Sequence, residues 1–386
     1  MDRIRVLHFT EVINKYDFID VIIRFADPKK FEMQAASYKK LSNIENPGYD
    51  EQGIPYHSLN ITWGYWGFLA GAWKLSRLLK KEQIHILHTH HYYEAVMGRI
   101  ACWLYPACRH IVGRHYHNDL LLTTKGLKLR IYLFVERVIN KYATIIVSPS
   151  TLINELLTLQ GVASNKIRFV PYGFDFSAPR YKQLSLQEKE QLRTELGVAG
   201  RFLIGNFSRH HPIKGQLDLL TAFEIFVNGH SEAHLIMVGD GPFRPRLEKY
   251  VQDHAMTHVV TFLGWRKDGH RLMNAMDVIV HPTLQEAFPQ TMIEVMALGI
   301  PLLICPVSGA TDVVQHEESG VLIPFHSPRP IHDYLERIFS DRAWGQELGK
   351  HARQRAYRYE IKEVIGLYES VYESILAKLM AHKKLK

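Results

Sequence analysis

Two glutamates eight residues apart, Glu286 and Glu294, are the residues whose types and spacing point most directly to chemistry. They flank the run Ala-Phe-Pro-Gln-Thr-Met-Ile, between apolar strands predicted over 277–281 and 301–305. This order of strand, loop, helix and strand places the pair at the carboxyl end of a parallel strand, where open α/β sheets bind ligands. Because Pro289 is favoured at a first helical position, we expect Glu294 more than one turn inside a helix and Glu286 on the loop before it.

Two cations, Arg209 and Lys214, stand in the loop after the strand predicted over 202–205, and Gly215 precedes the next helix. A forked guanidinium and an ammonium at this spacing suit a diphosphate, to which helix starts add free N–H groups. A solvated surface pair is the alternative for this loop. The turn that contains Gly239 is a weaker signal, since a strand-to-helix turn often needs glycine for backbone reasons alone.

The sequence gives little support for a metal or an organic cofactor. It has no Gly-x-Gly-x-x-Gly, no Walker loop and no Asp-x-Asp pair. Histidines gather at two predicted strand ends, at His85, His88, His90 and His91 and at His115 and His117. Zinc uses such clusters, but no Cys or Asp spacing supports it here. We therefore predict no metal, and expect one or two of these imidazoles to face an interdomain cleft and bond substrate hydroxyls.

Length and patterning predict an α/β protein with two Rossmann-like, doubly wound domains facing a central cleft. The 386 residues exceed one ordinary core, and two successive series of strands and helices follow each other along the chain. We predict an N-terminal domain over 1–172, a C-terminal domain over 173–355, and a helix over 356–386 that packs back on the N-terminal domain. The pattern from 343 to about 378 is helical.

The net charge of +8 favours anionic partners. No basic run with interleaved aromatics is present, so nucleic acid is not an expected partner. The three cysteines fit no metal or disulfide pattern, no signal peptide is apparent and no apolar stretch reaches 18 residues, which together predict a cytoplasmic protein. The segment 61–81 is aromatic at one end and basic at the other, as a helix on an anionic membrane surface is, although a core-facing helix is the other reading.

In combination these motifs resemble the retaining GT-B glycosyltransferases of the "group 1" family, which are glycosyltransferase family 4-like and use sugar nucleotides. The resemblance is strongest over 202–325, where the motifs stand in the family's order, and looser in the first half. Three departures occur. The loop after the first strand lacks a glycine pair, Pro289 replaces a common glycine, and Asp312 replaces a more usual glutamate.

The resemblance implies that the N-terminal domain is on the acceptor side and that the C-terminal domain binds the nucleotide sugar. It also implies roles for residues of this sequence, and the loop near Gly264 to Arg266 would border the base. Glu294 would bond the ribose hydroxyls and Glu286 would lie beside the donor sugar. Arg209 and Lys214 would hold the diphosphate, and His115, or else His117, would contact the donor sugar. The remaining donor-binding residues implied in this way are Gly239, Gly264, Trp265, Arg266, Phe288, Gln290 and Thr291.

The implied reaction moves a sugar from a UDP- or GDP-linked donor to an acceptor hydroxyl, with retained configuration and without a bound metal. The expected setting is synthesis of cell-surface polysaccharide, lipopolysaccharide or glycolipid. The acceptor would be a glycan or lipid-linked, and the enzyme would be peripheral on the inner face of the membrane. Two alternatives stay open: a non-catalytic scaffold or regulatory module in a polysaccharide assembly complex, and a nucleotide-sugar epimerase.

Overall fold

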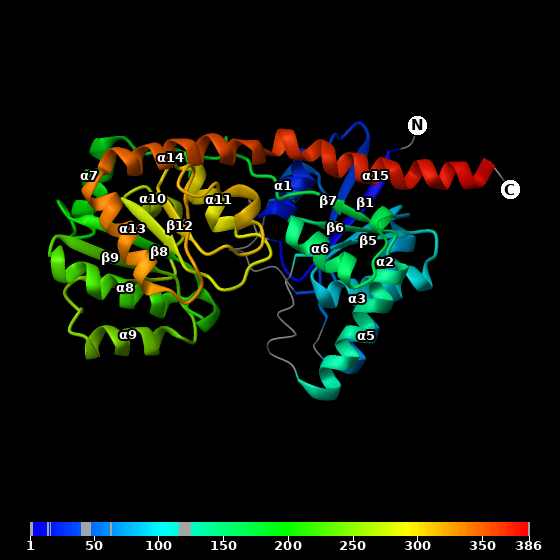
Figure 1. The fold of residues 1–386 in the computed structure, drawn as a ribbon. Helices are drawn as coiled ribbons and strands as arrows, with labels where there is room; N and C mark the ends of the chain where they lie inside the picture. Colours follow the sequence, from blue (N-terminus) through cyan, green and yellow to red (C-terminus); the bar gives the residue numbers. More distant parts are fainter. Residues whose placement is uncertain are drawn as a thin grey trace. The chain divides into compact units, whose positions relative to one another are not determined.

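The computed structural model describes residues 3–13, 15, 17–39, 48–61, 64–115 and 125–384. Contacts divide the chain into two compact units, each of which can be followed in Figure 1. The first unit consists of residues 1–175 and 359–386, and the second consists of residues 176–358. The chain therefore changes unit a few residues after the predicted positions 172 and 355, and its C-terminal segment belongs to the first unit.

The first unit is built on a seven-stranded parallel sheet with the strand order β3-β2-β1-β4-β5-β6-β7. Its central strands are almost wholly buried, which explains their apolar composition. The strands are β1 (Ile4–Thr10), β2 (Phe31–Ser37), β3 (Tyr56–Ser58), β4 (Ile86–His90), β5 (Arg109–Gly113), β6 (Ile145–Ser148) and β7 (Ile167–Phe169).

Helices connect and cover these strands. The start of α6 shows how the sequence sets a boundary, because the Ser150 side chain accepts a hydrogen bond from the Ile153 amide. The last helix, α15, packs against α1 (Figure 1). The helices of this unit are α1 (Phe18–Phe25), α2 (Tyr65–Lys81), α3 (Tyr92–Leu104), α5 (Gly126–Tyr142), α6 (Thr151–Leu159) and α15 (Ile361–Lys384).

The second unit is built on a six-stranded parallel sheet with the order β10-β9-β8-β11-β12-β13. Its strands are β8 (Phe202–Phe207), β9 (Ala233–Val238), β10 (Val260–Gly264), β11 (Val278–His281), β12 (Leu302–Ile304) and β13 (Val321–Leu322). Its helices are α7 (Leu186–Glu195), α8 (Gln216–Gly229), α9 (Arg244–Asp253), α10 (Gly269–Met273), α11 (Gln290–Ala297), α12 (Ala310–Val313), α13 (Pro328–Ser340) and α14 (Arg342–Ala356). The two parallel sheets with their helices confirm the predicted α/β class with two doubly wound, Rossmann-like domains.

One strand of the first unit, β2, was absent from the sequence prediction. Glu32 and Gln34 interrupt its apolar pattern, and the segment reads as a polar connection. The structure places it beside β1 in parallel register, with Phe31, Met33 and Ala35 buried. Pairing with a central strand thus decides the conformation of this segment, against its composition.

The predicted helical pattern from 343 to about 378 forms two helices, α14 and α15, and the C-terminal helix predicted from 356 begins at Ile361. Residues 357–359 form a single 3₁₀ turn between α14 and α15. The Phe174 amide donates to the Tyr359 carbonyl at 2.8 Å, and the Ile361 amide donates to the Phe174 carbonyl at 2.8 Å. These bonds take backbone groups that a continuous helix would use internally, so the helix breaks there.

Candidate functional site

The loops at the carboxyl edge of the second unit's sheet are joined by backbone hydrogen bonds. The Leu284 amide donates to the Ile213 carbonyl at 2.8 Å, which joins the loop after β11 to the loop after β8. The loop after β9 is joined in the same way to the end of β10, because the Gly239 amide donates to the Gly264 carbonyl at 2.8 Å. Residues from four strand ends are thereby brought to one edge of this sheet, as the sequence order predicts.

The glycine at the start of α8 permits one of these close approaches. Gly215 has φ +65°, and a Cβ at this position would lie 2.0 Å from the Pro282 carbonyl oxygen. A side chain here would therefore strain the backbone and collide with the loop after β11. The requirement for glycine follows from the packing of two loops.

Glu286 lies on the loop before α11, as predicted, and forms an ion pair with Lys214. The Thr283 hydroxyl donates to the same carboxylate oxygen at 3.3 Å, and His281 Nε2 lies 3.5 Å from it. Burial alone would raise the pKa of Glu286, but His281 and the Lys214 charge outweigh burial and lower this pKa to about 2. The carboxylate is therefore ionised at neutral pH and accepts hydrogen bonds.

Glu294 lies more than one turn inside α11, as predicted. Its carboxylate is 3.1 Å from His270 Nε2, and its side chain is 14% exposed. Burial opposes ionisation, but His270 and then Arg180 lower the pKa of Glu294 below its ordinary value. Pro289 is the N-cap residue of this helix and not its first helical residue, so that detail of the prediction was wrong by one position.

The start of α11 lies between the two carboxylates. The amides of Gln290 and Thr291 are in its first turn, where a helix has no internal acceptors, and no side chain caps the Pro289 position. The Phe288 side chain is buried against Gly309, which fixes the loop just before the helix. The positive end of the α11 dipole is therefore directed at the region between Glu286 and Glu294.

The two predicted diphosphate ligands differ in their surroundings. Lys214 is largely buried in its ion pair with Glu286, so the alternative of a solvated surface pair fails for this residue. Arg209 is exposed, and the described part of the chain gives its guanidinium no ion pair. The loop that carries it is held by Gln216, whose side-chain amide donates to the Arg209 carbonyl at 3.1 Å. The site thus contains one compensated and one uncompensated cation.

The predicted base-binding loop is brought to the same sheet edge by the bond between Gly239 and Gly264. The side chains of Trp265 and Arg266, which follow Gly264, do not pack into this sheet edge. Trp265 is 66% exposed, and Arg266 makes a two-pronged contact with Asp268 at 2.7 and 2.8 Å. The backbone of this loop is therefore fixed, whereas its two large side chains lie at the surface.

Sequence reasoning missed several buried polar residues on β11 and on the segment between β8 and α8. Both ring nitrogens of His210, Nδ1 of His281 and Oε1 of Gln216 are buried without a hydrogen-bond partner among the described residues. Buried polar atoms are rarely left unpaired, so these atoms are candidates to bind a ligand or a water molecule. His281 ends a predicted strand, and this position was the one available signal. His270 and Arg180, which face Glu294, had none.

His115 lies in the first unit and is almost fully buried. Its Nδ1 is 2.9 Å from the Tyr172 hydroxyl and its Nε2 is 2.9 Å from His90 Nδ1. Both ring nitrogens therefore have partners within this unit. His117, the other candidate, is outside the described residues.

One group of three potential metal ligands occurs among the described residues, formed by His8, His88 and His90, and it is also in the first unit. Their ligand atoms lie within 4.8 Å of one another. Five of the six ring nitrogens form hydrogen bonds with histidine or tyrosine, and only His88 Nε2 has no partner. Hydrogen bonding thus accounts for this arrangement.

Comparisons with known proteins agree with the fold. Residues 188–358 match the family described as glycosyl transferases group 1, and residues 30–173 match the glycosyl transferase 4-like domain. The fold and these matches define a GT-B glycosyltransferase. The chain belongs to the group 1 family, and the predicted resemblance is confirmed at that level.

Two relatives cover most of the chain. N-acetyl-alpha-D-glucosaminyl L-malate synthase of Bacillus anthracis is 24% identical over 311 residues, which span 80% of this chain and 79% of the relative. UDP-Gal:alpha-D-GlcNAc-diphosphoundecaprenol alpha-1,3-galactosyltransferase of Escherichia coli is 28% identical over 278 residues, which span 69% of this chain and 70% of the relative.

Solved structures show the same fold. Anabaena Alr3699/HepE in complex with UDP and glucose has a TM-score of 0.81 at 20% identity, and the match covers 97% of this chain and 100% of that one. Sucrose-phosphate synthase from Thermosynechococcus elongatus has a TM-score of 0.77 at 18% identity, with the same coverage. Among the described helices, none is both long enough and apolar enough to cross a membrane.

Proposed function

We propose that this glycosyltransferase transfers a sugar from a nucleoside-diphosphate sugar to an acceptor hydroxyl with retention of configuration. The main support for this proposal is the Lys214–Glu286 ion pair, which is held beside the start of α11 by the joined loops after β8 and β11. It sets a fixed cation and an ionised carboxylate next to the amides of the first turn of a helix. This combination of groups suits a sugar diphosphate.

The charges of the site support departure of a diphosphate. An ammonium has three donors, so Lys214 can keep Glu286 oriented and still donate to a phosphate oxygen. Arg209 adds a second, uncompensated cation. Preorganised charge of this kind stabilises the negative charge that develops as the bond to the leaving group breaks. Glu286, ionised at neutral pH, would accept hydrogen bonds from sugar hydroxyls and cannot serve as a general acid.

The proposed reaction needs no general base from the protein. The bond between the anomeric carbon and the diphosphate oxygen breaks, and a new bond forms to the acceptor oxygen on the same face of the sugar. The acceptor proton passes to a phosphate oxygen of the departing nucleoside diphosphate. The proposal includes metal independence, because Arg209, Lys214 and the α11 dipole supply the positive charge. Proton NMR of the first-formed product tests retention of configuration, and repeating the reaction with EDTA tests metal independence.

For the donor, we propose a UDP-linked sugar. Two observations support UDP over GDP: the solved neighbour from Anabaena is in complex with UDP, and the Escherichia coli relative is named for UDP-galactose. A panel of UDP-, GDP- and ADP-sugars in a thermal-shift assay tests this choice, because a donor that binds the folded state raises the melting temperature by mass action. Stabilisation by GDP-sugars alone would overturn it.

The test of the whole proposal is transfer by purified protein. Lys214→Ala and Glu286→Ala should each lower kcat/KM by about 100-fold or more. Lys249→Ala, which removes an exposed lysine paired with Asp253 on α9, is the matched control and should leave turnover unchanged. Unchanged turnover in both site variants would sink the proposal. Sugar-nucleotide turnover without any acceptor would favour an epimerase, and donor binding without turnover would favour a scaffold.

For the acceptor, we propose a glycan or lipid-linked glycan met at an anionic membrane surface, on the evidence of α2. This helix buries Ala72, Leu75 and Leu79 in the core of the first unit, so the core-facing reading holds for one side of it. Its other side is exposed and carries two kinds of residue. The aromatic half presents Trp66 and Trp73, and the basic half presents Lys74, Arg77, Lys80 and Lys81.

Helical periodicity places these exposed residues on a single face. Indole rings suit the interfacial region of a bilayer, and each cation near an anionic surface contributes about 1 kcal/mol. Reversing the four α2 cations to glutamate should therefore abolish sedimentation with phosphatidylglycerol vesicles. The matched control reverses four exposed cations of the second unit: Lys182, Arg246, Lys249 and Lys350. Equal losses in the two variants would show nonspecific charge attraction and count against α2.

A further inference from the structure

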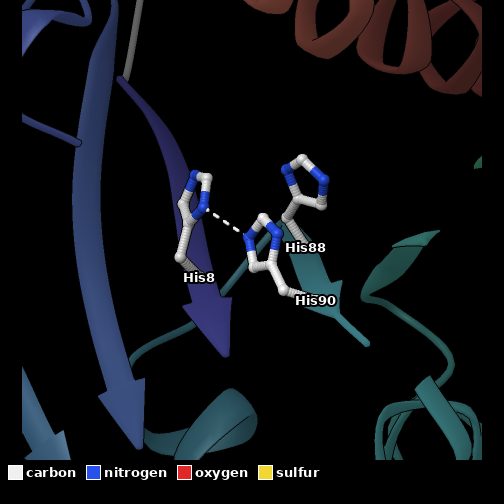
Figure 2. A group of neighbouring side chains, drawn as sticks. All are labelled: His8, His88 and His90. Atoms are coloured by element: carbon white, nitrogen blue, oxygen red, sulfur yellow. Dashed lines mark hydrogen bonds between the residues drawn. The ribbon is translucent and has the colours of Figure 1, made fainter. Parts of the chain in front are cut away.

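A chain of hydrogen bonds runs through the interior of the first unit, from Tyr172 through His115 to His88. Figure 2 shows three of its imidazoles, with the bond between His8 and His90 drawn dashed. The successive links are Tyr172 hydroxyl to His115 Nδ1 (2.9 Å), His115 Nε2 to His90 Nδ1 (2.9 Å), His90 Nε2 to His8 Nδ1 (2.9 Å), His8 Nε2 to the Tyr372 hydroxyl (3.2 Å), and that hydroxyl to His88 Nδ1 (3.0 Å).

The sheet register builds this chain. His8 on β1 stands opposite His88 on β4, and His90 stands opposite Gly113 on β5. A Cβ on Gly113 would lie 2.2 Å from His115 Nε2 and 3.1 Å from His90 Nδ1. The missing side chain therefore gives the His115 ring room to fold back over β5 and reach His90. Phe18 packs on the same ring, with centroids 4.6 Å apart.

Every histidine of the chain is neutral. Burial lowers the pKa of His8 to about 3 and lowers the pKa values of His88, His90 and His115 well below the ordinary value of 6.5. A neutral imidazole has one N–H donor and one acceptor nitrogen. Each link between two rings fixes the next, so only two arrangements of protons satisfy the whole chain when the Tyr372 hydroxyl donates within it.

In the first arrangement every chain histidine carries its proton on Nδ1, Tyr372 donates to His8, and His88 Nε2 is left as an acceptor without a partner. In the second arrangement every proton is on Nε2, and the same His88 atom is left as a donor without an acceptor. This atom is buried and has no partner among the described residues. Orphaned buried N–H groups are rarer in proteins than orphaned acceptors, which favours the first arrangement.

We infer that His90 is a positioning residue for His115, and that the chain holds His115 neutral with its proton on Nδ1 and its Nε2 as an acceptor. The inference rests on the proposed function and on the predicted contact of His115 with the donor sugar. It gives His115 a fixed ring plane and no positive charge, so compensation of the leaving diphosphate falls to Arg209 and Lys214.

Nitrogen-15 NMR of histidine-labelled protein tests the chain without an activity measurement. At about pH 7.5 the signals of His8, His88, His90 and His115 should show the Nδ1–H tautomer, whereas a free neutral histidine favours Nε2–H. His90→Phe should shift His115 toward the Nε2–H form. An Nε2–H tautomer of His115 in the unaltered protein, or no change in His90→Phe, would overturn the inference.

Steady-state kinetics test the positioning role. His90→Phe should lower kcat/KM by about tenfold or more, while UDP raises the melting temperature as in the unaltered protein. His90→Asn can both donate and accept, and it should restore a large part of the activity and serve as the readout if the phenylalanine variant does not fold. His110→Phe is the matched control, since His110 is equally buried on β5 but bonds Thr89 outside the chain.

Equal losses in His90→Phe and His110→Phe would show a merely structural role. The proposed function and the positioning role of His90 can fail separately. If the unaltered protein transfers no sugar, the proposed function fails while the NMR result still decides the tautomers. If transfer occurs and the tautomer of His115 does not change in His90→Phe, only the positioning role fails.

Discussion

The acidic pair of the second unit and the histidine chain of the first unit keep polar side chains away from water in opposite ways. Glu286 and Glu294 stay ionised, because Lys214, His281, His270 and Arg180 lower their pKa values against the effect of burial. The chain histidines stay neutral, because burial lowers their pKa values, and all their ring nitrogens except His88 Nε2 bond another ring or a phenol among the described residues. One region is held by charge and the other by hydrogen bonds between uncharged groups.

This difference shows what each region is suited to do. A preformed carboxylate and cation can bind a charged ligand with little reorganisation, which agrees with a donor site. A neutral imidazole chain cannot compensate charge, but it fixes ring orientation and proton position. Under the proposed function, the second unit would bind the diphosphate and the histidine chain of the first unit would position one side chain.

The largest expected effect is that low pH destabilises the first unit more than the second. Five buried histidines of the first unit, His8, His88, His90, His110 and His115, have lowered pKa values. Such a histidine stays neutral in the folded state, whereas in the unfolded chain, where its pKa is 6.5, it takes up a proton as the pH falls. The stability of the first unit should therefore be full above pH 6.5 and should fall as the pH drops from there toward the folded pKa values.

Hydrogen exchange by mass spectrometry at pH 7.5 and 5 measures this effect. Peptides of the first unit should lose protection before peptides of the second, where His210 and His234 have lowered pKa values but the two glutamates stay ionised. His258→Gln changes an exposed histidine and should leave the order unchanged. Earlier loss of protection in the second unit would contradict the neutral chain.

Removing the charge of Lys214 should have the next largest effect. Lys214→Ala leaves Glu286 buried without its main cation, so we expect about 3 kcal/mol of lost transition-state stabilisation and reduced donor affinity. The double variant Lys214→Ala with Glu286→Gln should bind UDP more tightly than the single variant, because the uncompensated charge is gone. Isothermal titration with UDP measures both. Additive losses would show that the ion pair has no role in the site.

Glu294→Gln tests whether the second carboxylate reads the ribose. A hydrogen bond to a charged group contributes about 1.5–3 kcal/mol, so UDP affinity should fall by roughly 10- to 100-fold. The affinity for 2′,3′-dideoxy-UDP should change much less. Asp312→Asn, which removes a carboxylate on α12, is the control. An equal loss of affinity for both nucleotides would show that Glu294 stabilises the packing of α11 and does not contact the ribose.

Arg266→Ala should have the smallest effect. Its guanidinium is engaged with Asp268 at the surface, and exposed ion pairs contribute about 1 kcal/mol or less. UDP affinity should therefore fall by less than about tenfold. A larger loss would show that Arg266 leaves Asp268 to contact the nucleotide, which would extend the charged region toward the base.

Much of the second unit could be predicted because its signals are local. The spacing of Glu286 and Glu294 and the apolar strands on either side place both carboxylates at a sheet edge. The pairing of Lys214 with Glu286 could not be predicted, because it depends on the loops after β8 and β11 meeting through Gly215. His270 and Arg180 reach Glu294 from segments with no motif of their own.

The sequence by itself determined the family, the α/β class and the positions of the acidic pair, because period, spacing and residue type act within a short stretch of chain. Tertiary structure decided the conformation of β2, the break at 357–359 and the histidine chain. His8, His90 and His115 lie on or just after three different strands, and only the parallel register of β1, β4 and β5 brings their rings within hydrogen-bonding distance. Charged side chains show their role in composition and spacing, whereas a neutral network exists only where folding aligns its members.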